Sequence, residues 1–138
     1  MLLNQLSLGY EFLYSYNSAK DILQKYKLNE DLLSYLQKVE HSFTKKFLNP
    51  NDMINNIGEG WVAEEALGVA LYCVYHAISF EECLYMSANH SGDSDSTASL
   101  ACQLYVAKND LEEKYQTIKF DIEDALEMMI KKLDKYST

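Results

Sequence analysis

One apolar segment near the middle of the chain does most to limit the possible folds. Across residues 61–77 the strongly polar side chains are confined to Glu64, Glu65 and His76. A surface helix carries polar residues along a whole face, so this segment is predicted to be a central helix that packs against other elements on most sides. Its longest apolar run, residues 68–77, is too short to span a bilayer.

Helical periodicity continues on both sides of this segment. The chain has 138 residues with a single proline, Pro50, and five glycines, which argues against a turn-rich or disordered chain. No stretch alternates with the period of a strand. We therefore predict an all-α helical bundle that forms one domain over residues 1–138. The predicted helices cover about 2–16, 18–26, 30–43, 50–57, 61–77, 80–88, 95–108 and 118–136.

Several of these helices have specific signals. The first should place Leu2, Leu6, Tyr10 and Leu13 on one buried face, and Ser18 with Asp21 resembles a helix start. Asn29 and the Asn49-Pro50 pair are predicted to cap the helices that follow them. The last helix carries an apolar stripe, and its members are Ile122, Ala125, Leu126, Met129 and Leu133.

The charge of the chain excludes two classes of partner. The net charge is −9, and all 12 basic residues are lysines. No basic face for a nucleic acid and no polybasic anchor for a membrane is visible. Without arginine, a phosphorylated ligand would have to be held by backbone amides, lysine or a metal. Three cysteines without a zinc-site spacing, and no signal peptide, predict reduced thiols in a cytoplasmic protein.

The polar strip at residues 89–97 departs from the helical pattern. It holds two carboxylates, Asp93 and Asp95, and several hydroxyls directly before a helix. Helix capping explains such residues, and so does a magnesium site. Asp93, Asp95 and the Ser96 hydroxyl offer three hard oxygen ligands from one turn, while Gly92 permits a tight bend or a close approach. Three ligands are too few for a tight site, so further oxygens would have to complete it.

Two other motifs share part of their pattern with this strip. An EF-hand loop that began at Asp93 would need Gly at its sixth position and Glu at its twelfth, where Ala98 and Leu104 stand. The strip also fits the nucleophile motif of haloacid-dehalogenase-type phosphatases, but that motif follows a buried strand and residues 81–90 have no strand character. Neither motif explains the strip.

The strip resembles the C-terminal signature of the ADP-ribosylglycohydrolase family, in particular the dinitrogenase-reductase-activating type. The strip reads NHSGDSDST, and an upstream block at residues 58–67, GEGWVAEEAL, resembles the segment that precedes this signature in the family. The intervening ALYC (residues 70–73) and FEECL (residues 80–84) agree with it. The resemblance is concentrated in residues 55–107.

The resemblance implies an all-helical hydrolase with two magnesium ions that hold the ribose of an ADP-ribosyl group. Its D-x-D-[T/S] turn, which supplies metal ligands, corresponds to Asp93, Asp95 and Ser96. Ser91 and Gly92 are candidate substrate-binding residues. The expected reaction is metal-assisted hydrolysis of the bond between the ribose and a modified protein side chain. His90 either touches the ligand or metal or has a structural role.

The sequence also departs from the family pattern. Family members are about twice as long and carry a Thr-Asp-Asp-Thr turn that completes the metal site, and this turn has no counterpart here. The chain is therefore expected to resemble a C-terminal half. It either contributes to catalysis with an N-terminal-half partner or a second copy, or acts as an inactive helical interaction module. A third alternative is a stand-alone binder of ADP-ribose.

Most residues outside the strip are predicted to have structural roles. Trp61 is predicted to be a core anchor, with stacking on adenine as the alternative. Glu64 and Glu65 are predicted to lie on a solvated first turn, with a contact to the site as the alternative. His41 and His76 are predicted to be surface or interhelical residues.

Overall fold

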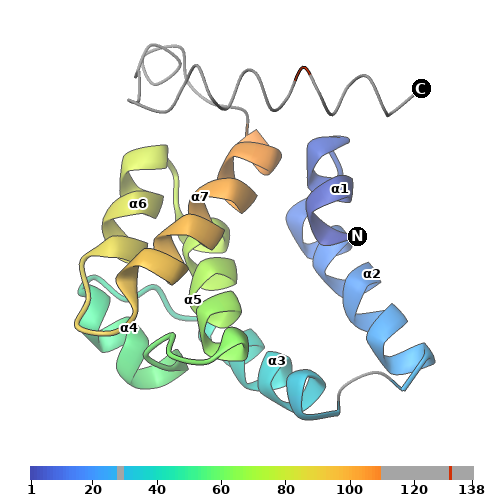
Figure 1. The fold of residues 1–138 in the computed structure, drawn as a ribbon, viewed down its shortest axis with the longest axis horizontal. Helices are drawn as coiled ribbons and strands as arrows, with labels where there is room; N and C mark the ends of the chain where they lie inside the picture. Colours follow the sequence, from blue (N-terminus) through green and yellow to red (C-terminus); the bar gives the residue numbers. More distant parts are fainter. Residues whose placement is uncertain (28–29, 110–130, 132–138) are drawn as a thin grey trace.

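The computed structural model describes residues 1–27, 30–109 and 131, and Figure 1 shows their arrangement. The regular elements of this part of the chain are all helices and it contains no strand, which confirms the all-α prediction. The predicted cap Asn29 and the predicted helix 118–136 lie outside the described residues. The helices are α1 (Leu2–Ser7), α2 (Phe12–Lys25), α3 (Glu30–Ser42), α4 (Pro50–Ile57), α5 (Ala63–His76), α6 (Phe80–Ala88) and α7 (Ser94–Asn109).

Helix α5 forms the centre of the bundle, as its apolar sequence predicts. It contacts α3, α4, α6 and α7, and Figure 1 shows it between these helices. Gly68 and every residue from Val69 to Val74 are buried. Burial on all sides of a helix is what a segment without a polar face requires.

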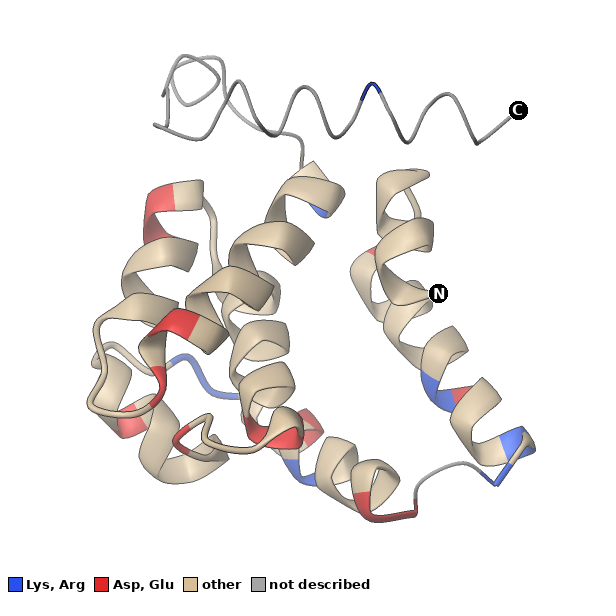
Figure 2. Cartoon of the chain, viewed as in Figure 1, with Lys and Arg blue, Asp and Glu red and all other residues tan. Residues whose placement is uncertain are grey.

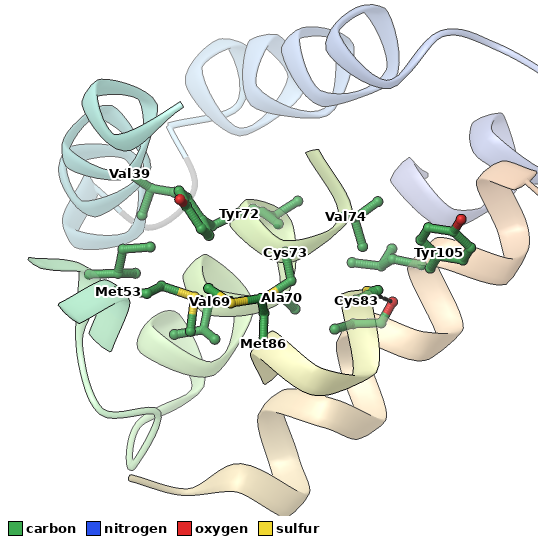
Figure 3. Packing of buried hydrophobic residues seen from close by; sticks show 14 of the residues in the cluster. Val39, Met53, Val69, Ala70, Tyr72, Cys73, Val74, Cys83, Met86 and Tyr105 are labelled. Atoms are coloured by element: carbon green, nitrogen blue, oxygen red, sulfur yellow. Dashed lines mark hydrogen bonds between the residues drawn. The ribbon is translucent and has the colours of Figure 1, made fainter. Parts of the chain in front are cut away.

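The core around α5 is close-packed (Figure 3). Tyr72 is fully buried, and its hydroxyl accepts a hydrogen bond from the Phe47 amide at 2.7 Å and donates one to the Lys45 carbonyl at 2.9 Å. The Cys73 thiol lies 3.6 Å from the Met53 sulfur. These contacts join α5 to α4 and to the loop that precedes α4. Cys73, Cys83 and Cys102 are free thiols, as predicted.

Side chains cap two of the helix starts, and the cap at Asn49-Pro50 confirms a prediction from the sequence. The Asn49 side chain accepts a hydrogen bond from the Asn51 amide at 2.8 Å, and Pro50 begins α4. The Ser79 hydroxyl accepts one from the Glu82 amide at 3.1 Å, so α6 begins at Phe80. None of the described helices is both long and apolar enough to cross a membrane.

The predicted single helix over residues 2–16 is wrong, because a turn divides it. Gly9 adopts a φ of 81°, a left-handed conformation that glycine tolerates without a steric penalty. The Tyr10 amide donates to the Gln5 carbonyl at 3.1 Å, which ends α1 and lets α2 leave in a new direction.

The turn also breaks the predicted apolar face of the first helix. Leu6 is buried, but Tyr10 and Leu13 are 50% and 46% exposed because they now follow a different axis. The predicted helix start at Ser18 and Asp21 is wrong as well. Both residues lie inside α2, where the helix continues without interruption.

Candidate functional site

The two segments that carry the family resemblance meet at one end of the bundle. The Asp93 amide donates a hydrogen bond to the Glu59 carbonyl at 2.8 Å. A Cβ atom on Gly92 would lie 2.0 Å from the same carbonyl oxygen. Only glycine allows these two loops to come so close. The close approach predicted for Gly92 is therefore made to the backbone of Glu59, and its predicted contact with substrate stays a prediction.

Asp93 caps helix α7. Its Oδ1 accepts a hydrogen bond from the Ser96 amide at 3.4 Å, and its carbonyl accepts one from the Thr97 amide at 3.2 Å. This is the geometry of an N-cap residue. The capping interpretation is confirmed for Asp93, and it is compatible with metal binding because the carboxylate has a second oxygen.

Thr97 and His90 hold the polar strip against α6. The Thr97 hydroxyl is fully buried and lies 2.7 Å from the Ser87 carbonyl and 2.9 Å from His90 Nε2. The Gly92 amide donates to His90 Nδ1 at 3.2 Å, so Nδ1 is unprotonated and Nε2 carries the hydrogen that Thr97 accepts. Burial lowers the pKa of His90, which favours this neutral form. These contacts give His90 a structural role.

A cavity of about 370 Å³ lies between the loop before α5 and the first turns of α7. Asp93 and Ser96 line it, whereas Asp95 and Ser91 are exposed and are not among the lining residues. The Ser91 amide donates to the Asn51 side chain at 2.9 Å. The other lining residues are Gly60, Trp61, Val62, Ala63, Ala66, Ser99 and Leu100.

The carboxylates around this cavity create a negative site. The neighbouring Asp95 side chain, followed by Ser96, holds the pKa of the Asp93 carboxyl below its usual range. Asp93 is therefore ionised at neutral pH. Figure 2 shows further acidic positions at the first turns of α5 and α7. A concentration of negative charge attracts cations to this end of the molecule.

The candidate ligands are oxygen atoms, which is the type that magnesium prefers, but they are fewer than a complete site needs. Asp93, Asp95 and Ser96 provide hard oxygens from a single turn, as Mg²⁺ prefers. Among the described residues, no group of three or more His, Cys, Asp and Glu side chains is arranged to hold a metal ion. The metal site therefore stays a prediction, with one loop as its protein contribution.

Trp61 differs from its predicted role as a core anchor. Its side chain is 66% exposed, and its indole Nε1 donates to the Glu59 carboxylate at 3.0 Å. The residue precedes α5 in the loop, so it lies at the edge of the cavity while the helix itself fills the core. The prediction is wrong because apolar character alone does not distinguish an anchor from an exposed ring.

Glu65 supports the loop before α5, as the alternative of a contact with the site had it, and does not lie on a fully solvated first turn. The Glu65 carboxylate accepts a hydrogen bond from the Gly60 amide at 3.1 Å, so this residue supports the site from a half-buried position. Asn51 and the Glu59 carbonyl bind the strip from other elements. Only the two glycines at positions 58 and 60 signalled an unusual backbone here.

Comparison with known proteins agrees with this geometry. The family model described as ADP-ribosylglycohydrolase matches residues 5–113. The chain belongs to the ADP-ribosylglycohydrolase family. The match begins well before the motif-bearing residues 55–107, so the end of α1 and the helices α2 to α4 are part of this ADP-ribosylglycohydrolase region. Searches of curated proteins and of solved structures found no match.

Proposed function

We propose that this ADP-ribosylglycohydrolase-family chain takes part in magnesium-dependent removal of ADP-ribosyl groups from modified protein side chains. Asp93, Asp95 and Ser96 are the proposed metal ligands. The supporting observation is the meeting of the two family segments at one cavity, with Asp93 and Ser96 in its wall and Trp61 at its edge.

Each residue has a distinct part in this proposal. Asp93 is fixed by its capping hydrogen bond, so the carboxylate is held in place before a ligand arrives. Asp95 and Ser96 add oxygens from the same turn. When bound, Mg²⁺ supplies Lewis acidity and a template for substrate oxygens. Gly92 and Ser91 are proposed to line the ligand, and Trp61 offers an aromatic face at the cavity edge.

The three proposed metal ligands are too few for a complete magnesium site, so the proposal includes a partner that supplies the others. An octahedral ion needs six ligands, and one turn of chain supplies about three, with water or ligand oxygens as possible additions. We propose that a second polypeptide or a second copy of this chain completes the site. Its substrate would be ADP-ribose attached to a protein.

A catalytically inactive interaction module is the alternative function. The observation that favours it is the absence, among the described residues, of any cluster of three metal-binding acidic, histidine or cysteine side chains. In this alternative the Asp93 carboxylate serves only as a helix cap. The two functions differ in whether magnesium changes ligand binding.

Calorimetry with ADP-ribose, with and without Mg²⁺, separates these functions. The proposal expects binding that requires magnesium and is lost on addition of a chelator. Asp93→Asn should weaken it strongly, since a metal-bound carboxylate is removed while a capping oxygen remains. Asp52→Asn in α4 is the matched control and should bind like the parent chain. Absence of binding in both conditions would favour the interaction module.

Hydrolysis is tested in a complex that turns over an ADP-ribosylated protein. If such a complex contains this chain, Asp93→Ala should abolish turnover, and Asp52→Ala should leave it unchanged. Undiminished turnover in the Asp93 variant would refute a catalytic contribution of this loop.

A further inference from the structure

A second cavity, of about 310 Å³, lies between the C-terminal part of α3, the loop that follows it and the last turn of α4. It shares no lining residue with the cavity at Asp93. None of the described residues that line it is acidic. Its polar lining side chains are Lys38, His41, Ser42, Thr44, Lys45 and Asn56. In a chain with a net charge of −9, this lining sets the cavity apart from the negative site.

The charges of Lys38 and Lys45 are not offset by a carboxylate. Among the described residues, neither side chain forms an ion pair. Figure 2 shows lysine positions, in blue, on α3 and on the loop that joins it to α4. The adjacent cavity of about 460 Å³ is less suited to an anion, because its Lys46 pairs with Glu82 and Asp52 lies in its wall. Two uncompensated positive charges beside one cavity attract an anion to it.

Aromatic rings hold both ammonium groups in place. Lys45 Nζ lies 4.8 Å from the centroid of the Phe47 ring, and Lys38 Nζ lies 5.8 Å from that of Tyr35. Both rings are anchored, because Phe47 is buried in the core and the Tyr35 hydroxyl donates to the Ile57 carbonyl at 2.6 Å. An ammonium group that rests on an aromatic face keeps N–H hydrogens for an anion. Its fixed position also reduces the entropy lost when a ligand binds.

Hydroxyl groups weaken the negative end of α3 next to the cavity. The carbonyls at the C-terminus of a helix carry partial negative charge, which repels an anion. The Ser42 hydroxyl donates to the Val39 carbonyl, and the Thr44 hydroxyl donates to the His41 carbonyl at 2.8 Å. These two hydrogen bonds offset part of the repulsion at this helix end.

We propose that this cavity binds a phosphate group, free or as a monoester of a small molecule, with Lys38 and Lys45 as its charged partners. Lysine binds phosphate as a point charge, so the site does not need the arginine that the chain lacks. The Asn56 side-chain amide donates one hydrogen to the Asp52 carbonyl at 2.8 Å and has a second hydrogen for a ligand oxygen. The volume lies at the lower end of the range for ligand pockets, about 300–1,000 Å³, which fits a small molecule.

Phosphate titrations of the full chain test this site without Mg²⁺. Inorganic phosphate and glycerol 3-phosphate are added separately at constant ionic strength, and amide chemical shifts are followed by heteronuclear NMR. We expect shift changes centred on residues 38–47 and dissociation constants of about 1–10 mM, as for two partly exposed ion pairs. Tighter binding of the ester would assign the cavity to a phosphate monoester, and equal or weaker binding of the ester would assign it to free phosphate.

Matched lysine variants locate the bound phosphate. Lys38→Gln and Lys45→Gln each remove one charge at the cavity. Lys25→Gln is the control, because it removes one charge at the end of α2, where Nζ lies 5.5 Å from the centroid of the Tyr26 ring. We expect each cavity variant to weaken phosphate binding by about three- to tenfold, and the control to change it by less than about 1.5-fold.

Three results would overturn the proposal. Equal weakening in Lys25→Gln would show that phosphate responds only to net charge. Absence of shift changes up to about 50 mM phosphate would show that the cavity does not bind it. Loss of phosphate binding in Asp93→Asn would place the anion at the proposed metal site, whereas we expect this variant to bind like the parent chain.

Discussion

The backbone hydrogen bond from the Asp93 amide to the Glu59 carbonyl, 2.8 Å long, joins two loops that are far apart in the sequence. It fixes the start of α7 against the loop that precedes α5. The candidate site depends on this contact, because Asp93 and Trp61 line the same cavity only while the loops stay together.

Gly92→Ala should separate these loops. The new Cβ would lie 2.0 Å from the Glu59 carbonyl oxygen, and a backbone atom cannot move away as a flexible side chain can. We expect the free energy of unfolding to fall by about 1–3 kcal/mol, measured by chemical denaturation. Ser91→Ala is the control, since it keeps its backbone hydrogen bond to Asn51 and should change stability by less than about 0.5 kcal/mol. Equal stability of both variants would contradict the close contact.

Thr97→Val should destabilise the polar strip. Valine preserves the shape of the buried side chain but leaves His90 Nε2 and the Ser87 carbonyl without the hydroxyl between them. The expected cost is about 1–3 kcal/mol in the free energy of unfolding. Thr97→Ser keeps the hydroxyl, so a smaller loss is expected in the same denaturation experiment. A serine variant that is less stable than the valine variant would count against the hydrogen-bond explanation.

Trp61 should report on the cavity by fluorescence. It is the only tryptophan of the chain and its ring is 66% exposed, so the free protein should show red-shifted emission that acrylamide quenches efficiently. ADP-ribose with Mg²⁺ should shift the emission to the blue and reduce quenching if the ligand occupies the cavity. Emission that is already shielded in the free protein would contradict the exposed position.

His76 should make stability depend on pH. Burial lowers its pKa, the positive charge of Lys46 adds to this effect, and Glu82 opposes it. The rings of Tyr72 and Tyr75 pack against the imidazole. Because the folded pKa lies below the unfolded value, the unfolded chain binds more protons in acid. The stability contribution of His76 is thus present above about pH 6.5 and is lost as the pH falls through the folded pKa.

Denaturant unfolding at a series of pH values measures this dependence. His76→Phe keeps an aromatic ring but does not titrate, so its stability should fall less steeply in acid than that of the parent. The slope should not vanish, because burial also lowers the pKa of His90. Parallel stability profiles for the two proteins would show that His76 contributes nothing to the pH dependence.

Local signals made part of the fold predictable. The predicted cap at Asn49 sets the start of α4 through a hydrogen bond to the amide two residues later. The apolar composition of α5 identified the centre of the core. The prediction of a single helix over residues 2–16 was wrong because the apolar stripe continues past Gly9. The stripe alone does not reveal that Gly9 adopts a left-handed conformation and ends the helix.

Only the part of the candidate site that lies within one short stretch of sequence was predictable. The strip around Asp93 stood out by composition, but its partners Glu59 and Asn51 come from distant loops and helices. Such contacts depend on the packing of the whole bundle and on backbone atoms that every residue type has. The exposure of Trp61 was missed for the same reason, since it follows from the path of the loop.

The loop between α6 and α7 is fastened on both sides of Gly92, through Ser91 to Asn51 and through Asp93 to Glu59. Its conformational entropy has therefore already been given up when the bundle folds. A ligand that enters the cavity meets a preorganised wall, and little of its binding energy is consumed in ordering the loop. The affinity of this site for a metal or a sugar would then depend mainly on how many binding atoms the protein supplies. The described residues supply about three of the six oxygens that an octahedral metal ion needs.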